Sequence, residues 1–213
     1  MYLPEHFHQT DPALLHQAIV DHPLGALVTL TPAGLTADHI PFLWEPRGEQ
    51  GTLIGHVARN NPVWRLGSGV EEALVIFQGP AHYISPNWYP SKQETHEVVP
   101  TYNYLVVHAH GPLHIHEDEK WLRGVVGKLT KHFESNEPQP WKMADAPRDY
   151  LQSMLAEIVG VEIPITRLTG KWKVNQNRLP HDRAGVVAAL HATGTAADLT
   201  MANLVAESLS RGT

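Results

Sequence analysis

The chain has 213 residues, of which 42% are hydrophobic and only 18% charged, and its formal net charge is −6. This length and apolar content predict a folded protein with a sizeable core, while the negative charge argues against a protein dedicated to non-specific nucleic-acid binding. Cysteine is absent, which excludes disulfides, thiolate catalysis, zinc fingers and iron–sulfur clusters.

No targeting segment is visible. The N-terminal residues Met1-Tyr2-Leu3-Pro4 show no basic region followed by an apolar run, and no stretch is long enough to span a membrane. The expected location is therefore the cytoplasm, without a membrane partner.

The first half of the chain predicts one helix and then a series of short strands. Thr10-Asp11-Pro12 has the cap-and-proline pattern of a helix start. Apolar runs bounded by glycine and proline predict strands over 25–31, 35–44, 52–57, 73–77, 81–85, 102–110 and 113–116. Pro41 cannot donate to a sheet, so its strand is expected to be bulged or to lie at an edge, with main chain free for a ligand. The long connection 86–100 is expected to be a lid or a binding segment.

The second half of the chain changes to helical spacing. Helices are predicted over 117–133, 147–158, 180–190 and 196–209, and one late strand over 161–173 is expected to bend near Pro164. Strands in one block with helices after them favour an α+β fold, an antiparallel barrel of six or seven strands packed by helices. We expect a single domain over 1–213 with a C-terminal helical extension from about residue 178.

The stretch 53–62 is the most informative local pattern. A strand ends near Val57, a short connection carries Arg59, and Asn61-Pro62 is a helix start with a cap followed by proline. Free N–H groups at a helix start, together with an arginine, favour an anion such as phosphate. The alternative is a capped helix beside a surface arginine.

Two polar segments with aromatic residues suggest a planar ligand. In 171–178, lysines flank Trp172 and amides follow; in 100–104, Thr101 and Asn103 stand beside tyrosines. Amides and lysines can bind the edge and charge of such a ligand while an aromatic ring stacks on it. The alternative is a solvated turn over a packed Trp172, and a strand with tyrosines in the core.

Four histidines between 108 and 116 are a candidate metal site. Residues two apart on a strand share a face, so His108 with His110, or His114 with His116, could ligate a metal. No carboxylate is interleaved with them, and we favour a strand decorated with histidine and no bound metal.

Several motifs together resemble the PaiB family, described as FMN-binding negative transcriptional regulators. They cover nearly the whole chain in order and are His39–Phe42, Gly55–Pro62, Phe77–Pro80, Tyr83–Tyr89, Val99–Tyr104, Val159–Ile163 and Lys171–Arg178. Tyr102 stands where the family often has Trp, a change that preserves stacking. The resemblance implies an FMN-binding split barrel, similar to pyridoxamine phosphate oxidase and small flavin reductases, that forms a homodimer with flavin in the cleft between subunits.

The resemblance also implies a set of FMN contacts. The flavin ring would lie along the edge strand at Asp38, His39, Ile40 and Pro41. The phosphate would lie at His56, Val57, Ala58, Arg59 and Asn61, with Arg59 as the charge. Ala58 replaces the hydroxyl residue of many flavin barrels, which would shift the phosphate toward backbone N–H groups or lysines. The residues expected around the ring are Tyr102, Asn103, Trp172 and Gln176, supplied in part by the second subunit. Lys171 and Lys173 are the lysines expected near the phosphate, and Thr101 is a further expected cofactor contact.

The implied role is regulation or a flavin-dependent reduction, with any catalysis supplied by the cofactor and no catalytic side chain assigned. Two alternatives remain open. One is a DNA-binding repressor, although the sequence has no helix-turn-helix with a basic second helix. The other is a haem-binding split barrel, because histidines are plentiful.

Overall fold

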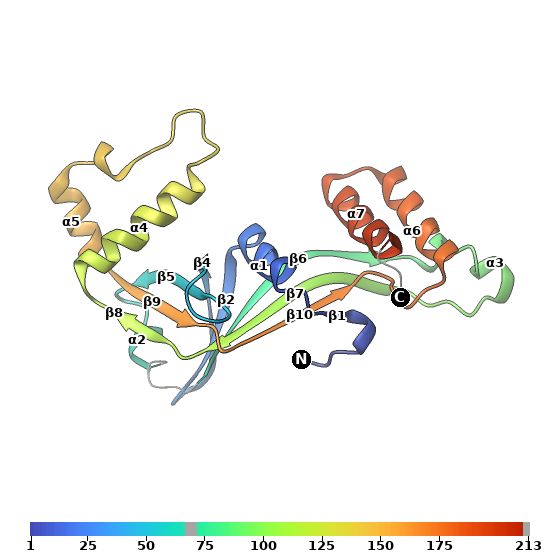
Figure 1. Ribbon diagram of the computed structural model, residues 1–213, viewed down its shortest axis with the longest axis horizontal. Helices are drawn as coiled ribbons and strands as arrows, with labels where there is room; N and C mark the ends of the chain where they lie inside the picture. The colour runs from blue at the N-terminus through green and yellow to red at the C-terminus, as the bar shows by residue number, and fades with distance from the viewer. Residues whose placement is uncertain (67–71, 211–213) are drawn as a thin grey trace. The chain divides into compact units, whose positions relative to one another are not determined.

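The computed structural model describes residues 1–66 and 72–210 (Figure 1). Its elements in chain order are η1 (Glu5–Phe7), β1 (His8–Gln9), α1 (Pro12–Asp21), β2 (Leu24–Thr31), β3 (Gly34–Pro41), β4 (Leu43–Glu45), β5 (Thr52–Ala58), α2 (Val63–Leu66), β6 (Ala73–Ile84), η2 (Pro86–Trp88), α3 (Lys92–Thr95), β7 (Thr101–Gly111), β8 (His114–His116), α4 (Glu119–Phe133), η3 (Met143–Asp145), α5 (Arg148–Ala156), β9 (Ile158–Pro164), β10 (Arg167–Lys173), α6 (Pro180–Thr193) and α7 (Ala196–Ser210). The α+β class predicted from the sequence is confirmed.

The chain forms two compact units. The first unit comprises Met1–Leu15, Gln78–Val107 and Thr169–Thr213, and the second comprises His16–Phe77 and His108–Leu168. Both units are built from separate stretches of the chain, so neither is a continuous half of the sequence.

The first unit is a sheet covered on one face by two helices. Its strand order is β1-β10-β7-β6, and α6 and α7 lie side by side (Figure 1). Strand and helix side chains share one core, formed by Ile84, Tyr89, Val174, Val186, Leu190, Met201, Ala202 and Val205. The opposite face carries exposed aromatic rings, with Tyr83 and Tyr102 edge to face at 5.9 Å between ring centroids.

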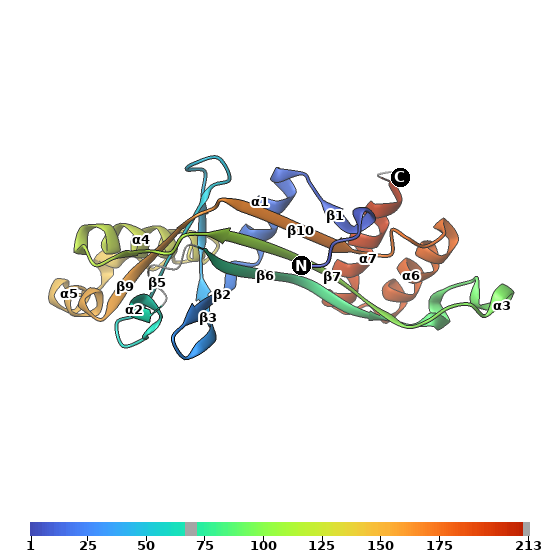
Figure 2. The same ribbon diagram turned by 90° about the horizontal axis from the view of Figure 1, so that it is seen from below.

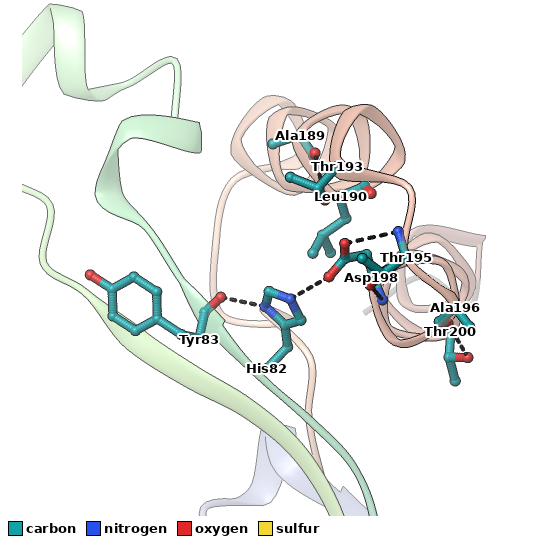
Figure 3. A network of polar contacts seen from close by, with 9 residues as sticks. All are labelled: His82, Tyr83, Ala189, Leu190, Thr193, Thr195, Ala196, Asp198 and Thr200. Carbon is teal, nitrogen blue, oxygen red and sulfur yellow. Dashed lines mark hydrogen bonds and ion pairs between the residues drawn. The ribbon is translucent and has the colours of Figure 1, made fainter.

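The start of α7 is held to β6 by a polar network (Figure 3). Asp198 and Thr195 form a reciprocal cap, in which Asp198 N donates to Thr195 Oγ1 and Thr195 N donates to Asp198 Oδ2. His82 on β6 lies with Nε2 2.6 Å from Asp198 Oδ1 and Nδ1 2.5 Å from the carbonyl oxygen of Tyr83. Both ring nitrogens of His82 therefore lie within hydrogen-bond distance of oxygen atoms, one on β6 and one on α7.

The second unit contains two strand assemblies. In one, the order is β6-β2-β3, and β2 pairs antiparallel with β3 from Leu24↔Pro41 to Thr31↔Gly34. In the other, the order is β4-β5-β9-β8, with α4 and α5 beside β5 and β9 (Figure 2). Ile54 on β5 packs with Val125 and Leu129 of α4, because the apolar residues of α4 recur at helical spacing.

Strand β3 ends its strand order and leaves one edge unpaired within the described residues. The expectation that Pro41 marks an edge is therefore confirmed. The predicted single strand over 35–44 is wrong, because the chain breaks at Phe42 and residues Leu43–Glu45 pair with β5 instead.

The predicted break at Gln78-Gly79-Pro80 is also wrong, because β6 runs unbroken from Ala73 to Ile84. Only Leu74–Ile76 of β6 pair with β2, so the missing N–H of Pro80 costs no bond to that strand. Among the described residues, no helix combines the length and the apolar content needed to span a membrane.

Candidate functional site

A polar cavity of about 310 Å³ lies at the open edge of β3 in the second unit. Its walls come from β3, β5 and the connection that follows β5, and the lining residues are Asp38, His39, Ile40, His56, Val57, Ala58, Asn61 and Ile158. All but Ile158 belong to the set predicted from the sequence. Pro41 and Arg59, also predicted, lie beside the cavity without lining it.

Gly55 and a hydrogen bond between the side chains of Asn61 and Asp38 shape this cavity. A Cβ on Gly55 would lie 3.1 Å from the carbonyl oxygen of Pro41, so glycine lets β5 approach β3 closely. Asn61 Nδ2 donates to Asp38 Oδ1 at 2.7 Å, and Asn61 Oδ1 accepts from the N–H of Val63 at 2.9 Å. Asn61 thus fixes the connection to β3 and also caps α2, as predicted.

Arg59 is engaged by protein groups. Its Nε donates to the carbonyl oxygen of Ala156 at 2.7 Å, its Nη2 to that of Ile158 at 3.1 Å, and its Nη1 pairs with Glu117 at 2.7 Å. A guanidinium has five N–H groups, so two have no partner among the described residues and remain for a ligand. The residue ties the end of β5 to the start of β9.

Three of the backbone N–H groups expected to be free at this helix start are bonded within the protein. The N–H of Arg59 donates to Glu157 and that of Asn61 donates to Ala58, while that of Val63 is held by the cap. Helix α2 has only four residues, so its dipole is small. A phosphate here would depend on side chains.

His56 lies at the cavity wall with one unsatisfied nitrogen. Its Nδ1 is buried and has no hydrogen-bond partner in the described residues. Burial lowers the pKa of His56 below its usual 6.5, so the ring is neutral at pH 7. The residue therefore offers a neutral hydrogen-bonding group.

The first unit brings together a second part of the predicted set, on the open face of its sheet. Lys173 Nζ donates to Thr101 Oγ1 and, at 2.8 Å, to the carbonyl oxygen of Tyr102. Lys171 Nζ donates to the carbonyl oxygen of Tyr2 at 3.0 Å. Burial lowers the pKa of Lys173, with Lys171 and Arg178 contributing repulsion. This face combines Lys173 with exposed aromatic rings, whereas Lys171 is buried beside Tyr2.

Asn103, Trp172 and Gln176 lie on the other face of that sheet. Asn103 is fully buried and donates through Nδ2 to Asn175, whose own Nδ2 donates to Tyr89 Oη. The two amide ends of Gln176 are bonded to Val174 N and to the carbonyl oxygen of Trp172. One flat ligand on one face of this sheet cannot contact both predicted groups.

Trp172 and Gln176 line a cavity of about 760 Å³ in the first unit, together with Arg183. Arg183 is 9% exposed; its Nη1 donates to the carbonyl oxygen of Ser208, and its Nε has no hydrogen-bond partner within the described residues. Sequence reasoning missed this residue. The signal available was an arginine on the first turn of the helix that follows the Lys171–Arg178 motif.

The histidine run does not converge on a metal. Across the described residues, no group of three His, Cys, Asp or Glu side chains is arranged to hold one. His116 stacks on Trp121 and lies 2.8 Å from the buried carboxylate of Glu162, which also pairs with Arg47. His110 pairs with Glu72.

These residues fit a flavin in three respects. An unpaired strand edge can hydrogen-bond the polar edge of an isoalloxazine ring, His56 is one of the residues that line the polar cavity at this edge, and the first unit carries aromatic rings next to lysines. The fit is weakest for the phosphate, because the described residues that line the cavity at β3 include Asp38 but no lysine or arginine.

Comparison with protein families matches residues 1–167 to a family described as "Putative FMN-binding domain". The chain is 29% identical to the protease synthase and sporulation protein PAI 2 of Bacillus subtilis, over 99% of both chains. It is also 32% identical to an uncharacterized protein of Aspergillus fumigatus, over 97% of both chains.

Solved structures share the fold at low sequence identity. The FAD and heme binding protein of Mycobacterium smegmatis superposes with a TM-score of 0.56 at 17% identity, covering 78% of this chain and 73% of that one. The flavocytochrome Anf3 of Azotobacter vinelandii gives 0.55 at 12% identity, covering 78% and 69%. The split-barrel fold predicted from the sequence is confirmed.

Proposed function

Since this chain belongs to the PaiB family of FMN-binding proteins, we propose that it is an FMN-dependent reductase whose flavin ring lies along the open edge of β3. FMN is the cofactor of this family, and when bound it supplies hydride and electron transfer. The observation that carries the proposal is the unpaired edge of β3 beside a polar cavity with a neutral histidine.

The residues of the chain would bind and orient the cofactor. The main chain of Asp38–Ile40 would hydrogen-bond the polar edge of the ring, and the two remaining N–H groups of Arg59 would bind the phosphate. The Asn61–Asp38 hydrogen bond would keep the pocket in shape before binding, which lowers the entropy lost on association.

The proposal includes a homodimer, as the family resemblance implies. The open face of the first unit, with Tyr83, Tyr102 and Lys173, is the surface with the mixed aromatic and cationic character that such an assembly or its cofactor would cover. Light scattering of the FMN-loaded protein should give twice the mass of 23.7 kDa; a monomer at all concentrations would contradict this part.

Reduction of the bound cofactor tests the reductase role. Under anaerobic conditions NADH or NADPH should bleach the visible absorbance of the FMN-loaded protein, and 1,4-benzoquinone should restore it. A fluorescence anisotropy titration with DNA from upstream of its own gene is the comparison, because a repressor would need direct DNA binding. No bleaching with either nucleotide, together with tight sequence-specific DNA binding at moderate salt, would overturn the proposal.

A further inference from the structure

A second, apolar cavity of about 380 Å³ lies in the second unit, on the other side of His56 from the strand edge. We call it the apolar pocket; its lining residues are His56, Ala58, Val126, Met143, Leu151, Met154, Leu155, Glu157 and Ile158. It shares His56, Ala58 and Ile158 with the polar cavity at β3. Its volume is within the range of small-molecule sites, which are mostly apolar with few polar groups.

Strand alternation explains why His56 reaches this pocket. Ile54, two residues earlier on β5, packs against α4, so His56 points to the same side of the strand. Helices α4 and α5 and the η3 turn supply the other walls, and a Cβ on Gly127 would lie 3.5 Å from Met143 Sδ. Two methionines in the wall can adapt to ligands of different shape.

The burial of His56 Nδ1 indicates which of the two ring nitrogens carries the proton. Nδ1 is buried without a partner in the described part of the chain, and an orphaned N–H donor is rarer in proteins than an orphaned acceptor. This favours the tautomer of the neutral ring that has its proton on Nε2. Because Nε2 is not among the buried atoms without partners, it is the nitrogen that a ligand can reach.

Glu157, the other polar residue in the lining of the pocket, does not favour a charged ligand. Glu157 is exposed, so water screens its carboxylate, and the described residues that line the pocket include no lysine or arginine. A charged molecule would lose hydration there without gaining a partner. An uncharged, mostly apolar molecule with a single hydrogen-bond acceptor would pack against the apolar side chains of the pocket and accept a hydrogen bond from the N–H of His56.

We propose that the apolar pocket binds a small, uncharged, largely apolar molecule whose carbonyl-type oxygen accepts a hydrogen bond from His56 Nε2. The binding claim stands independently of FMN.

Fluorescent binding of the uncharged naphthyl ketone prodan tests the binding claim, in the protein as purified and again after FMN loading. Prodan should bind with a blue-shifted emission. His56→Phe removes the donor while keeping a ring, and it should weaken binding about tenfold, the worth of one hydrogen bond. Val126→Trp fills the pocket and should abolish binding, with Leu151→Trp as a second filling variant if the first fails to fold.

His114→Phe is the matched control, because it makes the same exchange on an exposed strand residue of the same unit and should leave prodan binding unchanged. 2-Dimethylaminonaphthalene, which lacks the ketone, should bind equally weakly to the wild-type protein and to His56→Phe. The proposal is overturned if prodan does not bind the wild-type protein, or if His56→Phe or a folded filling variant binds it with unchanged affinity. Because these readouts do not require flavin, they are distinct from a failure of FMN binding.

Discussion

The guanidinium of Arg59 is bonded to two carbonyl oxygens and one carboxylate before any ligand binds. Such a residue has a structural task and can also bind phosphate with its two remaining N–H groups. A loss of FMN binding after mutation would therefore not by itself identify a phosphate ligand, since a loosened β5–β9 junction would have the same result.

Comparison of FMN with riboflavin separates these two tasks. In Arg59→Ala, FMN affinity should fall roughly ten- to hundredfold, as expected for a charge-assisted bond of about 1.5–3 kcal/mol. Riboflavin lacks the phosphate, so its affinity should change little. Isothermal titration of both ligands measures this, with Arg123→Ala on α4 as a control. An equal loss for both flavins would contradict the phosphate assignment.

Asn103 is predicted to contact the cofactor, and in the structure it is a core residue bonded to Asn175. Asn103→Ala would leave the Asn175 acceptor buried without its donor, at a cost of about 1–3 kcal/mol in the free energy of unfolding. Urea unfolding measures the loss. FMN affinity of the folded variant should be retained; a variant of wild-type stability that no longer binds FMN would instead support direct cofactor contact.

Helix α7 illustrates how an element depends on a residue distant in sequence. Its cap is formed by Thr195 and Asp198, whose hydrogen bonds with Thr195 and Thr193 hold the pKa of Asp198 well below its usual range. His82 on β6 adds a further bond to the same carboxylate. Docking of the helix and capping of its N-terminus are thus coupled through one side chain.

A double-mutant cycle tests this coupling. His82→Gln and Asp198→Asn should each lower Tm by a few degrees, and the double variant should lose less than the sum of the two, because the pair acts as a unit. Strict additivity would contradict a direct interaction. His181→Gln, at an exposed position of the same unit, should leave Tm unchanged.

At the scale of the whole molecule, four histidines have a side-chain pKa that is lowered by burial. Burial lowers the pKa of His16, His56, His108 and His110 below 6.5. The unfolded chain therefore binds more protons than the folded one as the pH falls below about 6.5, so folded-state stability is present above that pH and is lost on acidification.

Urea unfolding at pH 7.5, 6.5 and 5.5 should show a falling midpoint. In His56→Gln the slope with pH should be smaller, because one of the four titrating groups is gone. A midpoint that rises between pH 7.5 and 5.5 would show that these histidines do not dominate the pH dependence of folding.

Sequence patterns predicted most of the helices and strands but not where some strands are broken or continuous. Alternation and turn residues located β2, β5, β7, α4 and α6, because these depend on local periodicity and caps. The unbroken β6 through Pro80 and the break at Phe42 depend on which strand pairs where, and no local signal contains that information. The candidate site has the same limit. Arg183 on α6 lines the same cavity as Trp172, and this follows from how α6 packs on the sheet, which no local pattern in the sequence shows.

The most direct test of flavin binding at β3 is the visible absorption spectrum of the purified protein after addition of FMN and desalting. We expect a retained two-band flavin spectrum at one FMN per chain, because the open edge of β3 and its polar cavity are preformed. A protein that keeps no flavin, or one that shows a sharp Soret band in its place, would contradict the proposed function.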